Sequence, residues 1–441
     1  LTAYETVSIF MGDVGKIPHV SGVTGRGQAL PLQTPRIKNV IYTGDIGAVD
    51  RRLIPHTSYL VPIPKNIAGI KFYPTLDNFL LNLLKKSMMN KPIRVGLIGF
   101  GAAGQIYHAP ILTCVDGLQL SLIRASRPEQ IALARARYPQ SEIVADNDAI
   151  INNENIDLVV VATPNESHEP LAKAALLAGK HVVVEKPFTI TTREADELIA
   201  VAKREKRILT VNQNRRFEGD YATIRKIINS GMLGEIAEFE SHYDRFRNYL
   251  RPNAWREEDI PGSGIFYDLG AHLIDQVLEL FGLPNTITAD LRLQRKGAKA
   301  IDNFEVILNY EQLKVTLKGG MLIKEPLPRY IILGQQGSFV KYGTDVQEEA
   351  LKTGGIPNKT ANWGMEPKAS WGKINTEYKG MHLVSRVETE RGNYVDFYQN
   401  VYDTILGKAE LMVKPEESRN TIRVIELAMQ SNVEKRTVKY S

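Results

Sequence analysis

The feature that most constrains the fold is a regular alternation of short apolar runs with helical segments between residues 91 and 214. The apolar runs read "IRVGLIG", "LQLSLIRAS", "IDLVVVATP", "HVVVEKP" and "RILTVNQN". A strand that is apolar along its whole length is buried on both faces, which is typical of parallel sheets covered by helices. Residues 91–214 are therefore predicted to form an α/β domain built on a doubly wound parallel sheet.

After about residue 215 the pattern changes to alternating apolar and polar positions, as in "EIAEFESHYDRF", "ITADLRLQ", "DNFEVILNY" and "RYIILGQQGSFVKYG". Such alternation is typical of an antiparallel sheet with one face in the core. The last run reads as two strands around a Gly337-Ser338 turn. Helices are expected over 264–282, 393–407 and 415–435. Residues 215–441 are therefore predicted to form an α+β domain with a largely antiparallel open sheet, whose final helix can pack back on the first domain.

Residues 1–90 differ from the rest of the chain. They hold eight glycines and seven prolines and show no sustained helical period beyond a short amphipathic stretch at 75–87. We interpret them as an atypical extension, either poorly ordered or an artefact of the gene model, and assign them no function.

Charge and composition exclude several classes of function. Residues 1–90 hold ten Lys/Arg and five Asp/Glu; subtracting these from 55 and 50 leaves 45 of each for the rest, so no basic stripe for nucleic acid is expected. A single cysteine, Cys114, excludes an internal disulfide and a multi-cysteine zinc site, and no metal is expected. No apolar run approaches the roughly 18 residues of a membrane span, so a cytoplasmic protein without a membrane partner is expected.

A glycine-rich stretch, "GFGAAG", follows the first predicted strand and opens a predicted helix. In that context G-x-G-x-x-G indicates a dinucleotide-binding loop, although a purely structural turn is the alternative. The first glycine permits the tight turn, the second lets a diphosphate approach the backbone, and the third lets helix and strand pack closely. The expected cofactor contacts are Gly99, Phe100, Gly101, Ala102, Ala103 and Gly104.

The choice of cofactor is read at the end of the second strand, where NAD-binding proteins carry an acidic residue. This chain has "LIRASRPE" there, with no acid before Glu129. Ser126 and Arg127 can instead bind a 2′-phosphate, because a guanidinium forms a two-pronged contact with that dianion. NADP is therefore preferred, NAD remains possible, and a merely solvated Arg127 is the alternative.

Polar residues follow the later strands, at the edge of the sheet where such folds bind ligands. The fourth strand ends in "ATPNESH", and Thr163, Pro164, Asn165 and His168 are expected to line the cofactor cleft, with a surface position as the alternative for His168. The fifth strand ends in "VVEKPF", where the proline must stop the strand. Glu185 is expected to contact the cofactor there, beside Lys186.

Two further clusters lie beyond the first domain's strands. In "YDLGAHLID", Asp268 and His272 are four residues apart and share one helical face, with Tyr267 beside them, and all three are expected to bind substrate. Because an apolar helix should not bury such groups unpaired, they either face a cleft or form a structural Asp–His pair. In "NQNRRF", Asn214 and Arg215 can hydrogen-bond a polyol substrate, and Arg216 is interpreted as a surface charge.

Taken together, "GLIGFGAAG", "VVVEKPF", "NQNRRF" and "GSGIFYDLGAHLID" resemble the glucose–fructose oxidoreductase / inositol dehydrogenase (Gfo/Idh/MocA) family over residues 91–441, and "ESHYDRFR", "WRE" and "GSFVKYG" resemble its NADP-dependent scyllo-inositol dehydrogenase branch. The resemblance implies a Rossmann domain, a second domain whose open sheet builds homodimers or homotetramers, and a cis Lys186–Pro187 bond. It also implies that Lys186 lies beside the nicotinamide and that Asp268 and His272 form the family's D-x-x-x-H element.

The expected function is NADP-dependent hydride transfer between nicotinamide and a secondary alcohol or ketone of a cyclic polyol or sugar, with scyllo-inositol as the leading substrate. His272 is expected to take the hydroxyl proton, Lys186 to stabilise the developing alkoxide, and Asp268 to bind a neighbouring hydroxyl or orient His272. An aldose dehydrogenase and a non-catalytic NADP-binding regulatory paralogue are the alternatives.

Overall fold

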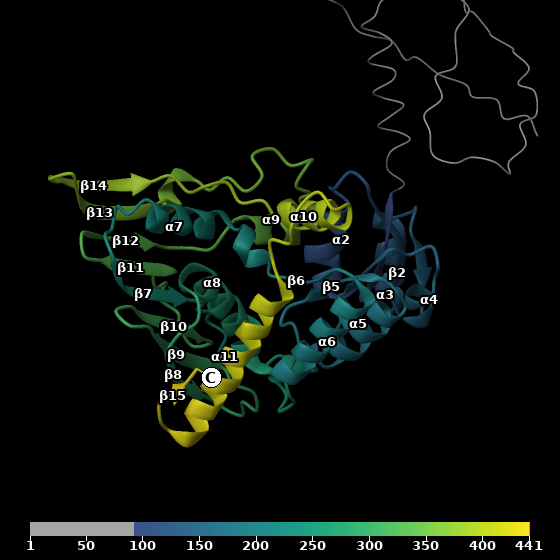
Figure 1. Ribbon diagram of the computed structural model, residues 1–441, viewed down its shortest axis with the longest axis horizontal. Helices are drawn as coiled ribbons and strands as arrows, with labels where there is room; N and C mark the ends of the chain where they lie inside the picture. Colours follow the sequence, from purple (N-terminus) through teal and green to yellow (C-terminus); the bar gives the residue numbers. More distant parts are fainter. Residues whose placement is uncertain (1–91, 441) are drawn as a thin grey trace, which may run out of the picture. The chain divides into compact units, whose positions relative to one another are not determined.

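The computed structural model describes residues 92–440 (Figure 1). The expectations for residues 1–90 lie outside this range. Within it, no helix is both long and apolar enough to cross a membrane.

The first domain is built on a six-stranded sheet in which all strand pairs are parallel. Along the sheet the strands follow the order β3-β2-β1-β4-β5-β6. Strands β2 and β3 are therefore added on one side of β1, and β4 to β6 on the other, so the strand order switches direction between β1 and β4. A doubly wound sheet binds its ligand at this switch point. This arrangement confirms the predicted fold class. The strands are β1 Ile93–Ile98, β2 Leu118–Arg124, β3 Glu142–Val144, β4 Leu158–Val161, β5 His181–Glu185 and β6 Leu209–Asn212.

Helices connect these strands, and local sequence signals fix their ends. Pro128 occupies the first turn of α3, where its missing N–H costs nothing. Thr191 and Glu194 form a capping box at the start of α6, and Lys206 ends that helix in a left-handed conformation. The elements are η1 Gly104–His108, α2 Ala109–Leu112, α3 Pro128–Arg137, α4 Asp148–Ile151, η2 Asn165–Ser167, α5 His168–Leu177 and α6 Thr192–Glu205.

The second domain contains a nine-stranded sheet in the order β14-β13-β12-β11-β7-β10-β9-β8-β15. Only β7 and β10 pair in parallel, so the prediction of a largely antiparallel sheet is confirmed. The strands are β7 Ile236–His242, β8 Thr286–Arg292, β9 Asn303–Asn309, β10 Lys314–Gly320, β11 Tyr330–Gly334, β12 Gly337–Lys341, β13 Gly372–Tyr378, β14 Met381–Val387 and β15 Val438–Lys439.

One turn in this sheet was predicted wrongly. Gly337 and Ser338 do not form the turn between β11 and β12; they are the first residues of β12 and pair with Gly334 and Leu333. The two residues between the strands are Gln335 and Gln336, which carry no turn signal.

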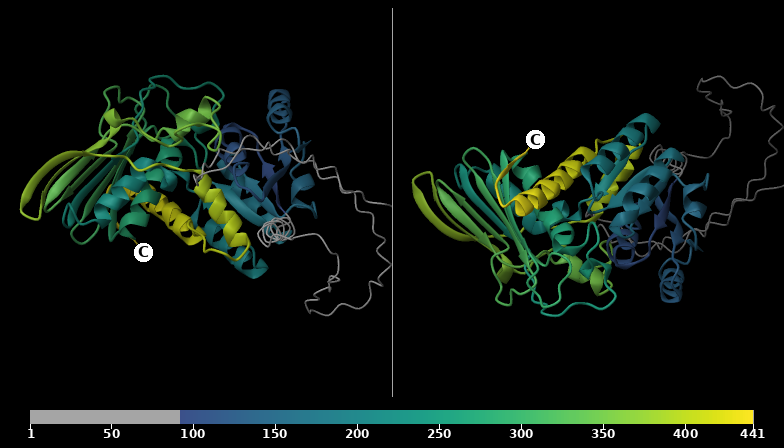
Figure 2. Two further views of the ribbon diagram at one scale, coloured as in Figure 1. Left: turned by 90° about the horizontal axis from the view of Figure 1, so that it is seen from above. Right: turned by 90° about the horizontal axis from the view of Figure 1, so that it is seen from below.

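Helices α8 and α11 pack against one side of this sheet, and Figure 2 shows the long yellow α11 beside it, whereas α9 and α10 contact η1 and α2 of the first domain. The helix expected over 264–282 begins as a π-helix, η5, and continues as α8. The elements are η3 Asn214–Phe217, α7 Gly219–Asn229, η4 Trp255–Glu257, η5 Phe266–Gly270, α8 Ala271–Phe281, α9 Gln347–Lys352, η6 Lys368–Ser370, α10 Val395–Ile405 and α11 Pro415–Glu434.

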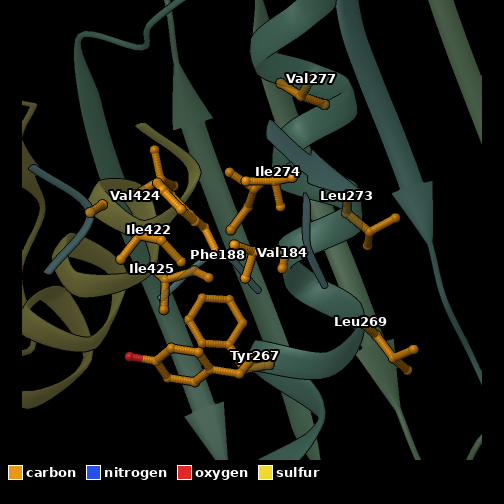
Figure 3. Packing of buried hydrophobic residues seen from close by; sticks show 14 of the residues in the cluster. Val184, Phe188, Tyr267, Leu269, Leu273, Ile274, Val277, Ile422, Val424 and Ile425 are labelled. Atoms are coloured by element: carbon orange, nitrogen blue, oxygen red, sulfur yellow. The ribbon is translucent and has the colours of Figure 1, made fainter. Parts of the chain in front are cut away.

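The last long helix, α11, packs on both domains. Figure 3 shows its residues Ile422 and Ile425 beside Phe188, which follows β5, and near Ile274 of α8; all of them belong to one buried cluster. Polar contacts reinforce this packing, because the Glu426 carboxylate accepts hydrogen bonds from the backbone N–H (2.8 Å) and the hydroxyl (2.6 Å) of Thr192 in α6. The strands of the first domain and the second domain therefore share one buried core.

Candidate active site

A cavity of about 570 Å³ lies at the carboxyl ends of the first domain's strands and is walled on its other side by the second domain. This is the edge at which doubly wound sheets bind ligands. The residues marked as candidates from the sequence that line it are Ala102, Ala103, Thr163, Asn165, Glu185, Lys186, Asn214, Arg215, Asp268 and His272.

The three glycines of the phosphate loop have different surroundings. A Cβ on Gly99 would collide with the carbonyl oxygen of Ala162, and one on Gly104 would collide with the carbonyl oxygen of Gly99. A Cβ on Gly101 would meet nothing within 4 Å. The first and third glycines are thus required by the protein's own packing, whereas the second leaves space at a helix N-terminus, which fits a diphosphate.

Phe100 contributes only its backbone to this loop. Its side chain is buried and its ring packs edge-on against Tyr138, with 6.1 Å between ring centroids. The loop expectation therefore holds for the backbone of residue 100 and not for its side chain.

Ser126 and Arg127 are exposed just beyond β2. Among residues 92–440, the Arg127 guanidinium has no hydrogen bond or ion pair. It stands at the start of α3 with its charge available to an anion at the end of β2, where the adenine ribose of a dinucleotide is held in this fold.

The structure corrects the position of His168. Its ring is fully buried, with Nδ1 2.8 Å from the carbonyl oxygen of Pro187 and Nε2 3.0 Å from that of Thr163. Burial lowers the pKa of this imidazole below its ordinary value. His168 is neither a surface residue nor part of the cavity wall; it ties together the loops that follow β4 and β5. Pro164 is exposed beside the cavity.

Lys186 is presented at the end of β5, and its bond to Pro187 is cis, as the resemblance implies. Its Nζ donates to the Asp268 carboxylate at 2.9 Å and to the Asp268 carbonyl oxygen at 2.7 Å. Burial alone would raise the pKa of Asp268, but Lys186 and then Arg256 outweigh it and hold that pKa below its usual range. The two domains therefore meet in a charged Lys186–Asp268 pair at the cavity.

Glu185 lines the same wall and has partners that the sequence did not reveal. Its Oε1 lies 3.4 Å from Nε2 of His108, whose Nδ1 is 2.6 Å from the hydroxyl of Tyr398, and it accepts from Nδ2 of Asn212 at 3.3 Å. Burial opposes the charge on Glu185, but His108 and then Lys186 lower its pKa overall. The sequence offered one indication that His108 is near the site, namely a histidine in the predicted helix that follows the glycine loop.

His272 is buried in the wall, and its Nδ1 has no hydrogen-bond partner among residues 92–440. Burial, then the charges of Lys186 and Arg215, place the pKa of His272 well below its ordinary value. The imidazole is therefore neutral and can accept a proton.

The structural Asp–His pair offered as an alternative is not formed, because Asp268 pairs with Lys186 instead. Orientation of His272 by Asp268 finds no support in these contacts.

Arg215 lines the cavity, but the protein itself uses much of its guanidinium. It donates to Glu218, to Glu348 of α9 and, at 3.0 Å, to the hydroxyl of Tyr394. Only its Nε lacks a partner among the described residues, as does Oδ1 of the neighbouring Asn214.

The structure corrects two other residues. Arg216 is buried, with two 2.7 Å bonds to the Asp275 carboxylate of α8 and a 2.6 Å bond to Glu417 of α11, so it is not a surface charge. Tyr267 was predicted to bind substrate but lies in the core beside Phe188, as Figure 3 shows, and its hydroxyl donates to the carbonyl oxygen of Ile190 at 3.2 Å.

Two wall segments were missed in the sequence. One is the loop after β7, which contributes Tyr243, Asp244 and four arginines, and the other is α9. The density of arginines between positions 245 and 256 was the available signal.

Among residues 92–440 no cluster of three potential metal ligands is present.

Comparison with known proteins agrees with this architecture. Residues 93–213 match the model of the oxidoreductase family's NAD-binding Rossmann fold, and residues 225–440 match that of its C-terminal alpha/beta domain. The uncharacterized oxidoreductase YdgJ of Escherichia coli K12 is 44% identical over 345 residues, which is 78% of this chain and 97% of YdgJ.

A second relative is the scyllo-inositol 2-dehydrogenase (NADP(+)) IolW of Bacillus subtilis 168, 38% identical over 359 residues, which is 81% of this chain and 99% of IolW. A solved structure of the oxidoreductase YvaA from Bacillus subtilis superposes with a TM-score of 0.76 at 38% identity, covering 79% of this chain and 98% of YvaA. The chain belongs to the Gfo/Idh/MocA oxidoreductase family.

Proposed function

We propose that this protein is an NADP(H)-dependent dehydrogenase that transfers a hydride between nicotinamide and a secondary alcohol or ketone of a cyclic polyol or sugar, with scyllo-inositol as the first substrate to test. The observation that carries the proposal is that one cavity wall holds both the Lys186 ammonium and the buried His272 imidazole, whose Nδ1 has no hydrogen-bond partner among residues 92–440. Similarity to IolW supports the substrate and the cofactor.

The chemistry divides between these side chains. A bound nicotinamide supplies the acceptor for the hydride. Lys186 donates a hydrogen bond to the reacting oxygen and stabilises its developing negative charge, while Asp268 holds the ammonium in place. His272 takes the hydroxyl proton as the carbinol hydrogen departs, and returns it in the reverse reaction.

The decisive variant is Lys186→Ala. Loss of a charged donor to the reacting oxygen should lower kcat/KM by about 100-fold to 1,000-fold, measured by absorbance at 340 nm with scyllo-inositol and other cyclic polyols. The matched control is Lys173→Ala, which removes an ammonium from a surface ion pair on α5 and should behave like the wild type. Turnover of Lys186→Ala within a few-fold of wild type would exclude the proposed role.

We also propose that the chain forms a homodimer or homotetramer through the second domain's sheet. The edge hairpin β13–β14 supports this, because it exposes the cross-strand pair Tyr378 and Met381 on one face of the sheet and Val384 on the other, with 38%, 62% and 51% of their surfaces accessible. Large apolar side chains grouped on a sheet are typical of association sites.

A further inference from the structure

The loop after β7 gives the cavity an excess of unpaired positive charge. Arg245, Arg247, Arg251 and Arg256 all line the cavity and come from twelve consecutive residues. Arg256 faces Asp268 at 3.5 Å and Arg251 faces Glu257 at 3.7 Å. Within residues 92–440, the guanidiniums of Arg245 and Arg247 have neither a hydrogen bond nor an ion pair, although that of Arg245 lies 5.7 Å from the ring centroid of Tyr243.

The backbone holds these two arginines in a fixed presentation. The N–H of Arg245 donates to the carbonyl oxygen of Gly320 at 2.9 Å, and that of Arg247 donates to the carbonyl oxygen of Met321 at 2.7 Å. Phe246 and Leu322 form an antiparallel bridge between these bonds. Residues two apart on an extended segment share a side, so Arg245 and Arg247 both face the cavity while half of the Phe246 surface is exposed to solvent.

No carboxylate among residues 92–440 forms a hydrogen bond or ion pair with either guanidinium, and Glu257 and Asp268 act on them electrostatically only at longer range. On the cavity wall, Asp268 is paired with Lys186 at 2.9 Å, whereas the Asp244 carboxylate lies 3.3 Å from Nδ1 of His242 without a hydrogen bond from any of residues 92–440. Partial burial, then the charges of Arg251 and Arg245, lower the pKa of Arg247. A bound anion would offset both the burial of the Arg247 charge and its repulsion by the neighbouring arginines, whereas neutral hydroxyl groups would not.

We propose that Arg245 and Arg247 form an anion-binding fork that holds a carboxylate or phosphate group of the substrate at a distance from the reacting carbon. This inference rests on the proposed function and narrows its substrate class to sugar or polyol acids and phosphate esters. A planar guanidinium binds either oxyanion with two parallel hydrogen bonds, so the shared chemistry is an anion with adjacent oxygens.

A matched series of sugars tests the fork. With saturating NADP⁺, initial rates at 340 nm are compared for D-glucose, D-glucuronate and D-glucose 6-phosphate, and calorimetry measures their binding to the NADP⁺-loaded enzyme. At least one charged sugar should exceed glucose about tenfold or more in affinity or kcat/KM, the expected gain from a charge-assisted contact. Which of the two does so identifies carboxylate or phosphate as the anion.

Variants separate the fork from other causes. Arg245→Gln combined with Arg247→Gln should bring the charged-to-neutral ratio close to one, and Arg247→Lys, which keeps the charge but not the fork, should give an intermediate ratio. Arg193→Gln removes an exposed arginine of α6 outside the cavity and should keep the wild-type ratio.

Two results would overturn the inference. One is equal binding of charged and neutral sugars by the loaded wild-type enzyme. The other is a double variant that raises KM for NADP⁺ with an unchanged ratio, which would assign the arginines to the cofactor's phosphates. Because calorimetry needs no turnover, selective anion binding without oxidation of any sugar would sustain the fork while counting against the proposed catalytic function.

Discussion

The protonation of His272 decides how the site can handle a substrate proton. Burial is the main cause of its lowered pKa, and the cations Lys186 and Arg215 add to it. A lowered pKa makes the imidazole a weaker base than free histidine, but it keeps the ring in its neutral, proton-accepting form at the pH of about 6.5 at which a free histidine is half protonated.

This direction predicts the pH profile for alcohol oxidation. The fall of kcat/KM on the acidic side should lie below pH about 6.5, because His272 becomes protonated only there. The measurement is kcat/KM at constant ionic strength across the acidic range. An acidic limb at or above pH about 6.5 would show that a different group, or an unshifted His272, accepts the proton.

We expect the choice of cofactor to depend on a single side chain, Arg127. Arg127→Ala should lower the ratio of kcat/KM for NADP⁺ over that for NAD⁺ by about tenfold, because only NADP⁺ carries the phosphate that the guanidinium can bind. Arg135→Ala, an exposed arginine of the adjacent α3, is the control. An unchanged ratio would remove Arg127 from the 2′-phosphate site.

Single residues were predictable where a motif fixes the backbone around them. Lys186 lies at the end of β5, so its place at the cavity follows from the strand alone. Tyr267 and His168 were placed wrongly because sequence position does not tell which way a side chain turns within a helix end. Arg216 could not be foreseen as buried because its partners, Asp275 and Glu417, are 59 and 201 residues away.

The turn from β1 into η1 is an element whose glycines can be told apart experimentally. Gly101→Ala adds a methyl group that meets no protein atom, so melting without cofactor should be unchanged while NADPH binding weakens about tenfold or more. Gly104→Ala presses against the Gly99 carbonyl and should lower the melting temperature itself.

Thermal unfolding without cofactor and fluorescence titration with NADPH measure the two effects separately. Undiminished NADPH affinity in Gly101→Ala would mean that the diphosphate does not approach the loop there.

Elements with strong periodicity were predictable, and those without it were not. The β4 run is apolar throughout, β1 and β5 are apolar at most positions, and β9 alternates buried and half-exposed positions. The β13–β14 hairpin was missed because β14 exposes most of its side chains, which removes the alternation that reveals a strand. The π-helical η5 could not be separated from α8, because both follow the same apolar helical pattern.

At the scale of the whole molecule, the proposed association has a direct test. Light scattering should give two or four times the chain mass of 49.4 kDa, and combining Met381→Lys with Val384→Lys should reduce it, because the two substitutions place a charge on each face of the exposed edge strand and a charge within a contact must be desolvated. Leu177→Lys alters an equally exposed side chain on α5 and should leave the mass unchanged. A wild-type protein of single-chain mass would refute the association.

The shared helix α11 also bears on how the protein is made. Glu426, the hydrogen-bond partner of Thr192, is synthesised 234 residues after it. At typical translation speeds this is a delay of roughly 10 to 50 seconds. During that interval the first domain of the nascent chain lacks the packing of α11 against it. The apolar surface of the first domain that α11 covers is buried only after α11 has been synthesised. A ribosome that stalls before that point would release a first domain with exposed apolar surface, which is a substrate for chaperones and proteases.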